Sequence, residues 1–521
     1  MPRPEYTRRT VMQGAGASWG AGALAALTGF APDAFAEPDP SPASEPFDPG
    51  HVIELAEALA AGEFAKPHRE VAEGFAKLTG EQFRDIRYRS EQTLWRGENL
   101  DCELQLYPMG WIYDIPVEIW QVVDGKARAL KADGSLFGFG SLIEKAPDEA
   151  PYGFSGFRLL GPINRAEQYE EFAQFQGASY FRAIGRGQHF GMSARGLAVD
   201  TAQPAGEEFP IFRSFWIEKP LAGSGKVVVH ALLDSRSAAG AYRFTIDPGE
   251  STSVEVEATL FLRRKLTHIG IAPLTSMYLH GTASRRVNDD VRPAVHDSEG
   301  LAVLNGKGER LWRPLRNPIK LQTSAFVDKD PKGFGLCQRD RSFVQFEDLE
   351  ARYERRPTVW VEPIGTWGEG YVELIEIPAE VQIHDNIVAL WKPAKGLEPG
   401  KPHTFAYRLT WAGDVPVAWT GARVRKTRVG KVRRDKDELE QFVVDFDGPG
   451  LKEINELPRA ELSVSSGVVS NLAVERNPEI AGVRTSFDLN AGGAEMVELR
   501  LGLKLNEQAI SESWLFRWTK T

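Results

Sequence analysis

The residues of this chain whose types and spacing could do chemistry are mostly carboxylates, and they gather in two polar clusters. The first cluster starts with His280 and continues over residues 288–298, which hold three aspartates and His296. Carboxylates and imidazoles can ligate a cation, but the DxDxDG spacing of a calcium loop is absent, and we expect no metal here. The alternative is a long surface loop whose aspartates make turns.

The second cluster is spread over residues 338–386 and ends in His384-Asp385-Asn386. Asp385 stands directly before the apolar run 387–391, at the mouth of a predicted strand. Partial burial at such a position raises the pKa of a carboxyl group and suits it to acid-base catalysis. Structural salt bridges explain the many Arg, Asp and Glu residues of this cluster equally well, so spacing alone leaves both interpretations open.

Several other classes of protein have no support in the sequence. Beyond residue 36 there is no GxSxG, HExxH or Walker A motif and no GxGxxG in a βαβ setting, which are the motifs of serine hydrolases, zinc proteases and nucleotide-binding enzymes. The formal charge of −10 argues against a nucleic-acid partner. Cys102 and Cys337 lack CxxC spacing, which excludes a zinc ribbon, and one disulfide between them remains an alternative.

The first 36 residues are predicted to be a twin-arginine export signal. Arg8 and Arg9 precede a weakly hydrophobic Gly/Ala/Leu run, and the small residues Ala34 and Ala36 offer a cleavage site. A transmembrane anchor is the alternative, but the run is too short and too weakly apolar for one. We therefore expect a periplasmic protein that is not inserted in a membrane once the signal has been cleaved.

The rest of the chain is predicted to be all-β. Residues 37–50 are rich in proline and acidic side chains, which is typical of a disordered spacer. Residues 51–79 carry apolar side chains at helical spacing and predict two short helices. Beyond residue 86, short alternating runs separated by Gly, Pro, Asn and Asp predict antiparallel strands without long helices between them. This pattern favours a large β-sandwich over residues 51–395.

A second, smaller domain is predicted after this sandwich. The Lys/Gly/Pro-rich stretch near 392–402 is interpreted as a linker. The alternating residues that follow fit the length of one immunoglobulin-like sandwich, which we place at 396–521. The basic run 423–436 within it predicts a solvated strand face, with contact to an anionic partner as the alternative.

Segments of both clusters resemble the periplasmic glucan biosynthesis proteins of the G/D type. The resemblance is carried by DDVRPAVHDSEGL at 289–301, by GFGLCQRDRSFVQFEDLEARYERRPTVWVEPIGTWGEGYVELIEIP at 333–378 and by HDNIVALWKP at 384–393. Upstream it continues through YPMGWIYD and MYLHG, so it covers essentially the whole predicted mature chain. A twin-arginine signal is typical of the D branch of this family, and the chain looks most like that branch.

The resemblance implies a fold, a substrate and a mechanism. The fold is a mutarotase-like N-terminal sandwich joined to an immunoglobulin-like domain, and the substrate is the β-1,2-glucan backbone of osmoregulated periplasmic glucans. No metal, nucleotide or other cofactor is expected. Inverting hydrolysis needs a carboxylic acid and a carboxylate base roughly 6.5–9.5 Å apart. The resemblance assigns the acid to Asp385 and the base to Asp297.

Further residues are candidates for supporting roles in this reaction. Tyr353 and Arg356 are expected to orient a relay of water and substrate hydroxyls beside Asp297. Candidates for contact with the sugar are Trp360, Trp367, Trp391, His296 and Arg292. The three tryptophans are explained equally well as core residues.

Three functions fit these residues. The first is an inverting endo-β-1,2-glucanase. The second is a transglycosylase that trims or cyclises the glucan, because Gln382 stands where many relatives carry glutamate, and the missing charge leaves open whether water or a sugar hydroxyl is the acceptor. The third is a non-catalytic glucan-binding scaffold that presents the backbone to an inner-membrane glucan synthase.

Overall fold

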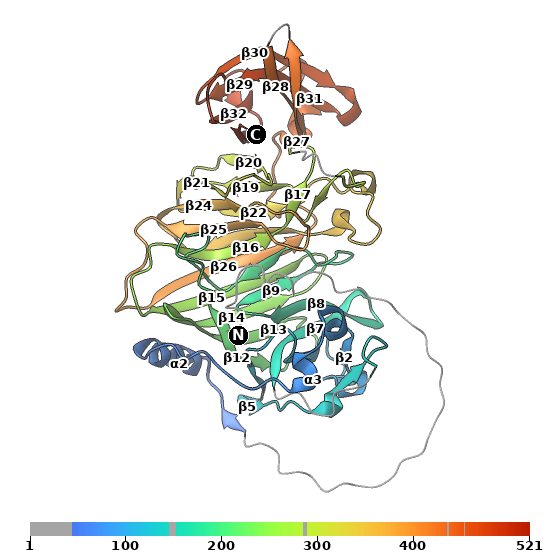
Figure 1. The fold of residues 1–521 in the computed structure, drawn as a ribbon, viewed down its shortest axis with the longest axis vertical. Helices are drawn as coiled ribbons and strands as arrows, with labels where there is room; N and C mark the ends of the chain where they lie inside the picture. The colour runs from blue at the N-terminus through green and yellow to red at the C-terminus, as the bar shows by residue number, and fades with distance from the viewer. Residues whose placement is uncertain (1–43, 145–152, 285–288, 435–436, 453, 521) are drawn as a thin grey trace.

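The computed structural model describes residues 44–144, 153–284, 289–434, 437–452 and 454–520 (Figure 1). The predicted export signal lies outside these residues, as does the start of the predicted spacer. The spacer ends earlier than predicted, because strand β1 (Glu45–Pro46) pairs with β5 (Lys126–Ala129) and helix α2 (Pro49–Ala61) follows at once.

Local sequence explains where α2 begins. The side chain of Asp48 accepts a hydrogen bond from the backbone N–H of Gly50 at 2.7 Å, and a proline occupies the first helical position. The helix buries Val52 and Ala56 against the outer face of the large sheet. Of the two helices predicted over 51–79, α2 is one, and only the single turn α3 (Glu73–Ala76) stands for the other; a further short helix, α4 (Gly80–Arg84), follows.

Two sheets face each other in the main body of the protein. Counted over the described residues, the larger has 16 strands and the smaller has 10. In spatial order the larger sheet contains β1, β5, β4 (Glu118–Val123), β12 (Ile211–Glu218), β13 (Val227–Asp234), β14 (Ala238–Asp247), β15 (Thr252–Leu262), β26 (His403–Ala412), β23 (Thr358–Ile364), β22 (Gly333–Cys337), β19 (Gly300–Leu304), β20 (Arg310–Pro314), β34 (Ser513–Thr519), β32 (Met496–Leu505) and β29 (Arg459–Val464), with β33 (Gln508–Ala509) beside β32.

The smaller sheet supplies the strands that lead to the predicted catalytic residues. In spatial order it contains β21 (Gln322–Lys329), β24 (Glu369–Glu376), β25 (Ile387–Pro393), β16 (Ile269–Ser276), β10 (Ser193–Arg195), β9 (Tyr180–Ala183), β8 (Gln168–Gln176), β7 (Phe154–Arg165) and β3 (Glu103–Pro108), with β11 (Ala198–Val199) beside β16. Two further pairs of short strands are β2 (Ile86–Tyr88) with β6 (Phe137–Phe139) and β17 (Tyr278–His280) with β18 (Val295–His296).

Aromatic rings from both sheets meet in the core between them. The ring of Phe157 lies 5.0 Å from that of Phe215 on the facing sheet, and Phe175 lies 5.2 Å from Phe244. Burial of this much apolar surface is the main stabilising contribution to such a sandwich. The predicted all-β class is therefore confirmed, and the apolar run 387–391 is the strand β25, buried on both faces.

The C-terminal part forms a second sandwich, which Figure 1 shows at the top of the molecule in orange and red. Its four-stranded sheet contains β27 (Arg423–Arg434), β28 (Asp437–Asp447), β31 (Gly482–Asn490) and β30 (Val468–Asn477), with the short helix α5 (Pro449–Lys452) after β28. Phe442 and Phe487 of this sheet pack against Trp514 of β34 on the other. Strand β34 also pairs in parallel with β20, so one sheet runs through both sandwiches.

The predicted domain boundary at residue 395 precedes a strand of the large sheet. Strand β26 lies between β15 and β23, paired with both along its length. The Lys/Gly/Pro-rich stretch 392–402 therefore connects β25 to β26 within one sandwich. Its composition suggested a linker between domains, but the same residues are common in any exposed turn.

The structure decides the question of the disulfide and also shows the surroundings of the basic run. Cys102 and Cys337 are buried free thiols, so they form no disulfide. The basic run forms β27, and four of its arginines form ion pairs with carboxylates on neighbouring segments. These pairs favour the solvated strand face, and contact with an anionic partner remains a prediction. These ion pairs are Arg423 with Asp414, Arg425 with Asp447, Arg428 with Asp445 and Arg434 with Asp488. Among the described residues, no helix is both long enough and apolar enough to cross a membrane.

Candidate active site

The two predicted catalytic segments meet where strand β16 ends. The backbone N–H of Asp297 donates to the carbonyl of Met277 at 2.8 Å, and the backbone N–H of Asn386 donates to the carbonyl of Ser276 at 3.0 Å. The side chain of Asn386 also accepts from the N–H of Tyr278 at 2.8 Å and donates to the carbonyl of Tyr278 at 3.0 Å. The segments of Asp297 and Asp385 are thus both anchored to residues 276–278.

Asp385 stands at the entrance of strand β25, next to the firmly bonded Asn386. Asp385 is half-buried and directly precedes Asn386, whose side chain is buried and donates a second hydrogen bond to the carbonyl of Ile377 at 3.0 Å. On the other segment, the hydroxyls of Ser276 and Ser298 lie 2.6 Å apart. Gln382 lies in the exposed stretch just before Asp385.

Asp297 is a buried carboxylate with two cationic neighbours. Its residue is only 7% exposed, and its Oδ1 lies 3.5 Å from Nε of Arg356. Burial raises the pKa of Asp297 above its ordinary value, while the charges of Arg356 and Arg182 act in the opposite direction and do not cancel the effect. A carboxylate in this state accepts a proton more readily than an exposed one.

The two predicted relay residues lie beside Asp297. Tyr353 opens the 3-10 turn Tyr353–Arg355, and the guanidinium carbon of Arg356 lies 5.5 Å from the centre of its ring. Burial, followed by the negative charge of Asp297, raises the pKa of Tyr353, so its phenol keeps its proton. Gly191 borders Arg356 so closely that a Cβ there would lie 2.9 Å from the Cδ of Arg356.

Arg182 was not predicted from the sequence. It lies on β9, a strand buried on both faces, and its charge acts on both Asp297 and Tyr113. Burial lowers the pKa of Arg182, while Glu171 and Tyr107 nearby favour its charged form. The sequence did hold one indication of its role: Arg182 is the only charged residue in the mainly apolar stretch 178–184. Charged residues are rarely buried without partners, so an arginine in such a stretch indicates a buried charged group nearby.

Arg292 and His296 are held by neighbouring protein groups. Arg292 donates from Nη2 to Asp290 at 2.7 Å and from Nη1 to Asp348 at 2.9 Å, so two carboxylates compensate its charge. The ring of His296 stacks on Tyr278 at 5.2 Å, and Phe346 meets it edge-on at 5.1 Å. These contacts give both residues a structural role, and their predicted contact with sugar remains a prediction.

The three tryptophans proposed for sugar stacking belong to the core. Trp360 is 1%, Trp391 is 0% and Trp367 is 8% exposed. Trp367 and Trp391 pack on each other at 6.1 Å, and the indole N–H of Trp367 donates to the carbonyl of Ala406 at 3.3 Å. Because no broad ring face is open to solvent, the structure favours the core alternative over stacking. In a strand, every second side chain points to the same face of the sheet. This period in the sequence therefore cannot distinguish a core Trp from one that lines a groove.

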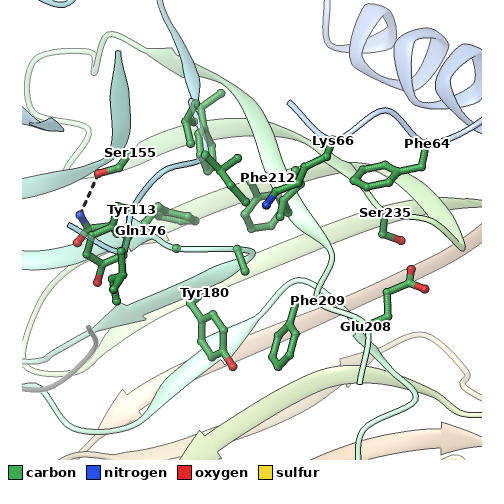
Figure 2. A pocket seen from close by; sticks show the side chains of 18 of the residues that line it. Phe64, Lys66, Tyr113, Ser155, Gln176, Tyr180, Glu208, Phe209, Phe212 and Ser235 are labelled. Atoms are coloured by element: carbon green, nitrogen blue, oxygen red, sulfur yellow. Dashed lines mark hydrogen bonds between the residues drawn. The ribbon is translucent and has the colours of Figure 1, made fainter. Parts of the chain in front are cut away.

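A separate cavity of about 290 Å³ is walled by aromatic rings, and we name it the aromatic cavity (Figure 2). Its walls include Phe64, Tyr113, Tyr180, Phe209 and Phe212. Burial raises the pKa of Tyr113 to about 12, although the charge of Arg182 lowers it. The charge of Arg182 thus lowers the pKa of one residue in the wall of this cavity, Tyr113, and also the pKa of Asp297.

We find no geometry suited to a metal in the described part of the chain. No three His, Cys, Asp or Glu side chains of the described residues gather in a way that could hold a metal ion. In the first polar cluster, His280 Nε2 lies 3.5 Å from Asp290 Oδ2.

Comparison with known proteins gives the family. The family model described as periplasmic glucan biosynthesis protein, MdoG, matches residues 47–518. The chain belongs to this family. It is 46% identical to glucans biosynthesis protein G of Bradyrhizobium diazoefficiens over 474 residues, which cover 91% of this chain and 93% of that protein. It is 45% identical to glucans biosynthesis protein G of Rhodopseudomonas palustris over 500 residues, which cover 95% and 99% of the two chains.

Membership in the glucan biosynthesis family confirms the resemblance drawn from the two clusters. The match to the family model includes both of them, and it also includes the C-terminal sandwich. A further relative, glucans biosynthesis protein G of Shewanella sp. strain W3-18-1, is 46% identical over 474 residues, which cover 91% of this chain and 87% of that protein. These three relatives carry the name of the G branch, whereas the assignment to the D branch rests on the predicted signal and stays a prediction.

Proposed function

We propose that this chain cleaves the β-1,2-glucan backbone in the periplasm as an inverting endo-β-1,2-glucanase, within periplasmic glucan biosynthesis. The observation that carries the proposal is the meeting of the Asp297 and Asp385 segments at the end of β16. Export by the twin-arginine pathway is part of the same proposal. The half-buried position of Asp385 leaves this residue partly open to solvent, where a substrate can reach it.

In the proposed reaction, Asp385 donates its proton to the glycosidic oxygen while the bond from this oxygen to the anomeric carbon breaks. A water oxygen bonds to the opposite face of the anomeric carbon and passes its proton to Asp297, directly or through a substrate hydroxyl. The raised pKa of Asp297 suits a base, because a general base works best when its pKa approaches the working pH.

Tyr353 and Arg356 have separate parts in this scheme. The neutral phenol of Tyr353 can donate a hydrogen bond to a water or hydroxyl beside Asp297. The guanidinium of Arg356 keeps Asp297 in its ionised form for a larger share of the time, since its charge lowers the pKa of that carboxyl.

The test is incubation of the protein with linear β-1,2-glucan, with products followed by mass and by their anomeric proton signals. We expect linear fragments of inverted configuration. Asp385→Asn and Asp297→Asn are each expected to lower turnover by about 100-fold or more, the usual contribution of a general acid or base. Asp289→Asn is the matched control, because Asp289 is an exposed carboxylate of the same loop.

Three outcomes would overturn the proposal. Full cleavage by Asp385→Asn would remove the assigned acid. Products with new linkages or rings would favour the second candidate, a transglycosylase, which the uncharged Gln382 near Asp385 supports. An unchanged polymer with every preparation, together with measurable glucan binding, would favour a non-catalytic scaffold for the glucan synthase.

A further inference from the structure

The segment Gln338–Arg341 lies between the candidate active site and the C-terminal sandwich. It follows β22 and precedes the 3-10 turn Phe343–Gln345, and it has no regular secondary structure of its own. Its four side chains nevertheless make hydrogen bonds or ion pairs to other segments, some to the site and some to the C-terminal sandwich. This density of contacts is more than a loop needs to connect two elements.

Gln338 ties together the two segments around Asp297. Its side chain is 0% exposed, and its Nε2 donates to the carbonyl of His296 at 3.2 Å and to the carbonyl of Tyr353 at 3.1 Å. His296 directly precedes Asp297, and Tyr353 is the proposed relay residue. One amide group therefore fixes the spacing between the proposed base and its relay.

Arg341 binds the other end of the turn that begins at Tyr353. Its Nη1 donates to the carbonyls of Glu354 at 3.1 Å and Arg356 at 2.8 Å. Its Nε donates to the carbonyl of Gly413, just after strand β26, at 2.6 Å. The flat guanidinium thus joins the turn that carries Tyr353 and Arg356 to the large sheet, and a lysine amine cannot reproduce this fork.

The two residues between them reach the C-terminal sandwich. Arg339 forms two hydrogen bonds to Glu512, at 2.7 and 2.8 Å, and donates to the carbonyl of Val424 at 2.8 Å. Asp340 Oδ2 lies 3.8 Å from Nζ of Lys426 on β27. Gln338 and Arg341 are therefore bound to the segments around Asp297, whereas Arg339 and Asp340 are bound to the C-terminal sandwich.

We propose that Gln338 and Arg341 are positioning residues for the reaction at Asp297, and that Arg339 and Asp340 anchor them to the C-terminal sandwich. The kinetic part of this inference rests on the proposed function. Positioning matters because a misplacement of about 1 Å can cost on the order of 100-fold in rate. The C-terminal sandwich then supports catalysis through these anchoring contacts.

The test compares Arg341→Lys and Gln338→Met with Arg425→Ala in the full chain acting on linear β-1,2-glucan. Arg341→Lys keeps the charge but loses the fork, and Gln338→Met keeps the shape but loses both donors. Arg425 is the control, because it pairs only loosely with Asp447, at 3.8 Å, and is half-exposed. We expect the first two variants to lower kcat by about 10-fold or more, with KM within about twofold of the wild type, and the control to leave both unchanged.

A pH profile separates positioning from a general loss of structure. Asp297 faces Arg356, Arg182 and Tyr353, and Arg356 lowers the pKa of this carboxyl. If Arg341→Lys releases the turn that carries Arg356, the acidic limb of kcat/KM moves to higher pH. A variant that merely lowers the amount of folded protein leaves the limb where it is.

Amide hydrogen exchange supplies a readout that does not need turnover. Peptides covering residues 296–298 and 353–356 are expected to exchange faster in Arg341→Lys and Gln338→Met than in the wild type, and not in Arg425→Ala. Unchanged exchange with unchanged kcat would overturn the inference. If the wild type has no activity on glucan, the proposed function fails, and faster exchange in these peptides alone would still support the anchoring.

Discussion

His296 is a buried neutral imidazole next to a buried carboxylate, Asp297. Burial lowers the pKa of His296 from its ordinary value of 6.5 to about 3. Between these two values the unfolded chain binds a proton at this residue and the folded chain does not. The contribution of His296 to the free energy of unfolding therefore has its full value above pH 6.5, and it decreases as the pH drops toward 3.

Replacing this histidine should remove part of the acid sensitivity of the fold. We expect His296→Phe, whose ring can keep the stacking on Tyr278, to lose less stability on acidification than the wild type, by about 1.4 kcal/mol for each pH unit below 6.5. Urea unfolding at pH 7, 5.5 and 4 measures this difference. His51→Phe, at an exposed position, is the control, and parallel curves for wild type and His296→Phe would contradict the expectation.

The residues predicted from the sequence were those in short recognisable motifs. Asp297 and Asp385 were assigned by resemblance, and Tyr353 and Arg356 were chosen from the YERRP segment. The structure places the segments of all four around residues 276–278 or beside Asp297. Arg182 was missed, because its strand lies more than a hundred residues earlier in the chain and only the fold brings it near. Sequence spacing carries no information on contacts across a sheet.

At the scale of elements, the loop from Gln338 to Arg341 is joined to the C-terminal sandwich by a buried ion pair. Arg339 and Glu512 are both nearly inaccessible, and the guanidinium also lies 3.6 Å above the ring of Trp312. A buried pair adds little net stability, but the loss of one partner leaves an uncompensated charge in the interior.

Glu512→Gln is expected to destabilise the protein by about 3–5 kcal/mol, because Arg339 would keep its charge without a carboxylate partner. The free energy of unfolding from urea titration measures the effect. Arg459→Ala provides a comparison, since its pair with Glu507 is exposed and such pairs contribute roughly 0–1 kcal/mol. Equal effects of the two substitutions would show that burial of the Arg339 pair has no energetic consequence.

Local sequence patterns predicted the type of each element better than they predicted which elements pair with it. Alternating apolar residues predicted strands, and strands form both sandwiches. The same patterns placed β26 in the wrong domain, because pairing with β15 and β23 depends on residues far away in the sequence. The spacer was predicted too long for a different reason: the proline-rich composition hid a helix that uses proline at its first position.

At the scale of the whole molecule, the two sandwiches share one sheet and one buried ion pair. Strand β20 of the large sandwich pairs with β34 of the small one, and Arg316 donates to the carbonyl of Arg517 at 2.8 Å. A shared sheet couples the unfolding of its two halves, because separating them breaks backbone hydrogen bonds and exposes buried rings.

Calorimetry should therefore show one cooperative transition for the full chain. The calorimetric and van't Hoff enthalpies are expected to agree, which is the standard test of all-or-none unfolding. Two resolved transitions, one of them removed by Glu512→Gln, would show instead that the sandwiches unfold independently.

The pairing of β20 with β34 also has a consequence for the order of events during synthesis. Leu311 pairs with Ser513, roughly 200 residues further along the chain. On a ribosome, the edge of β20 stays open until those later residues have been made, and an open strand edge invites pairing with other chains. The large sheet is therefore completed late in synthesis, and the edge of β20 is protected from aggregation only then.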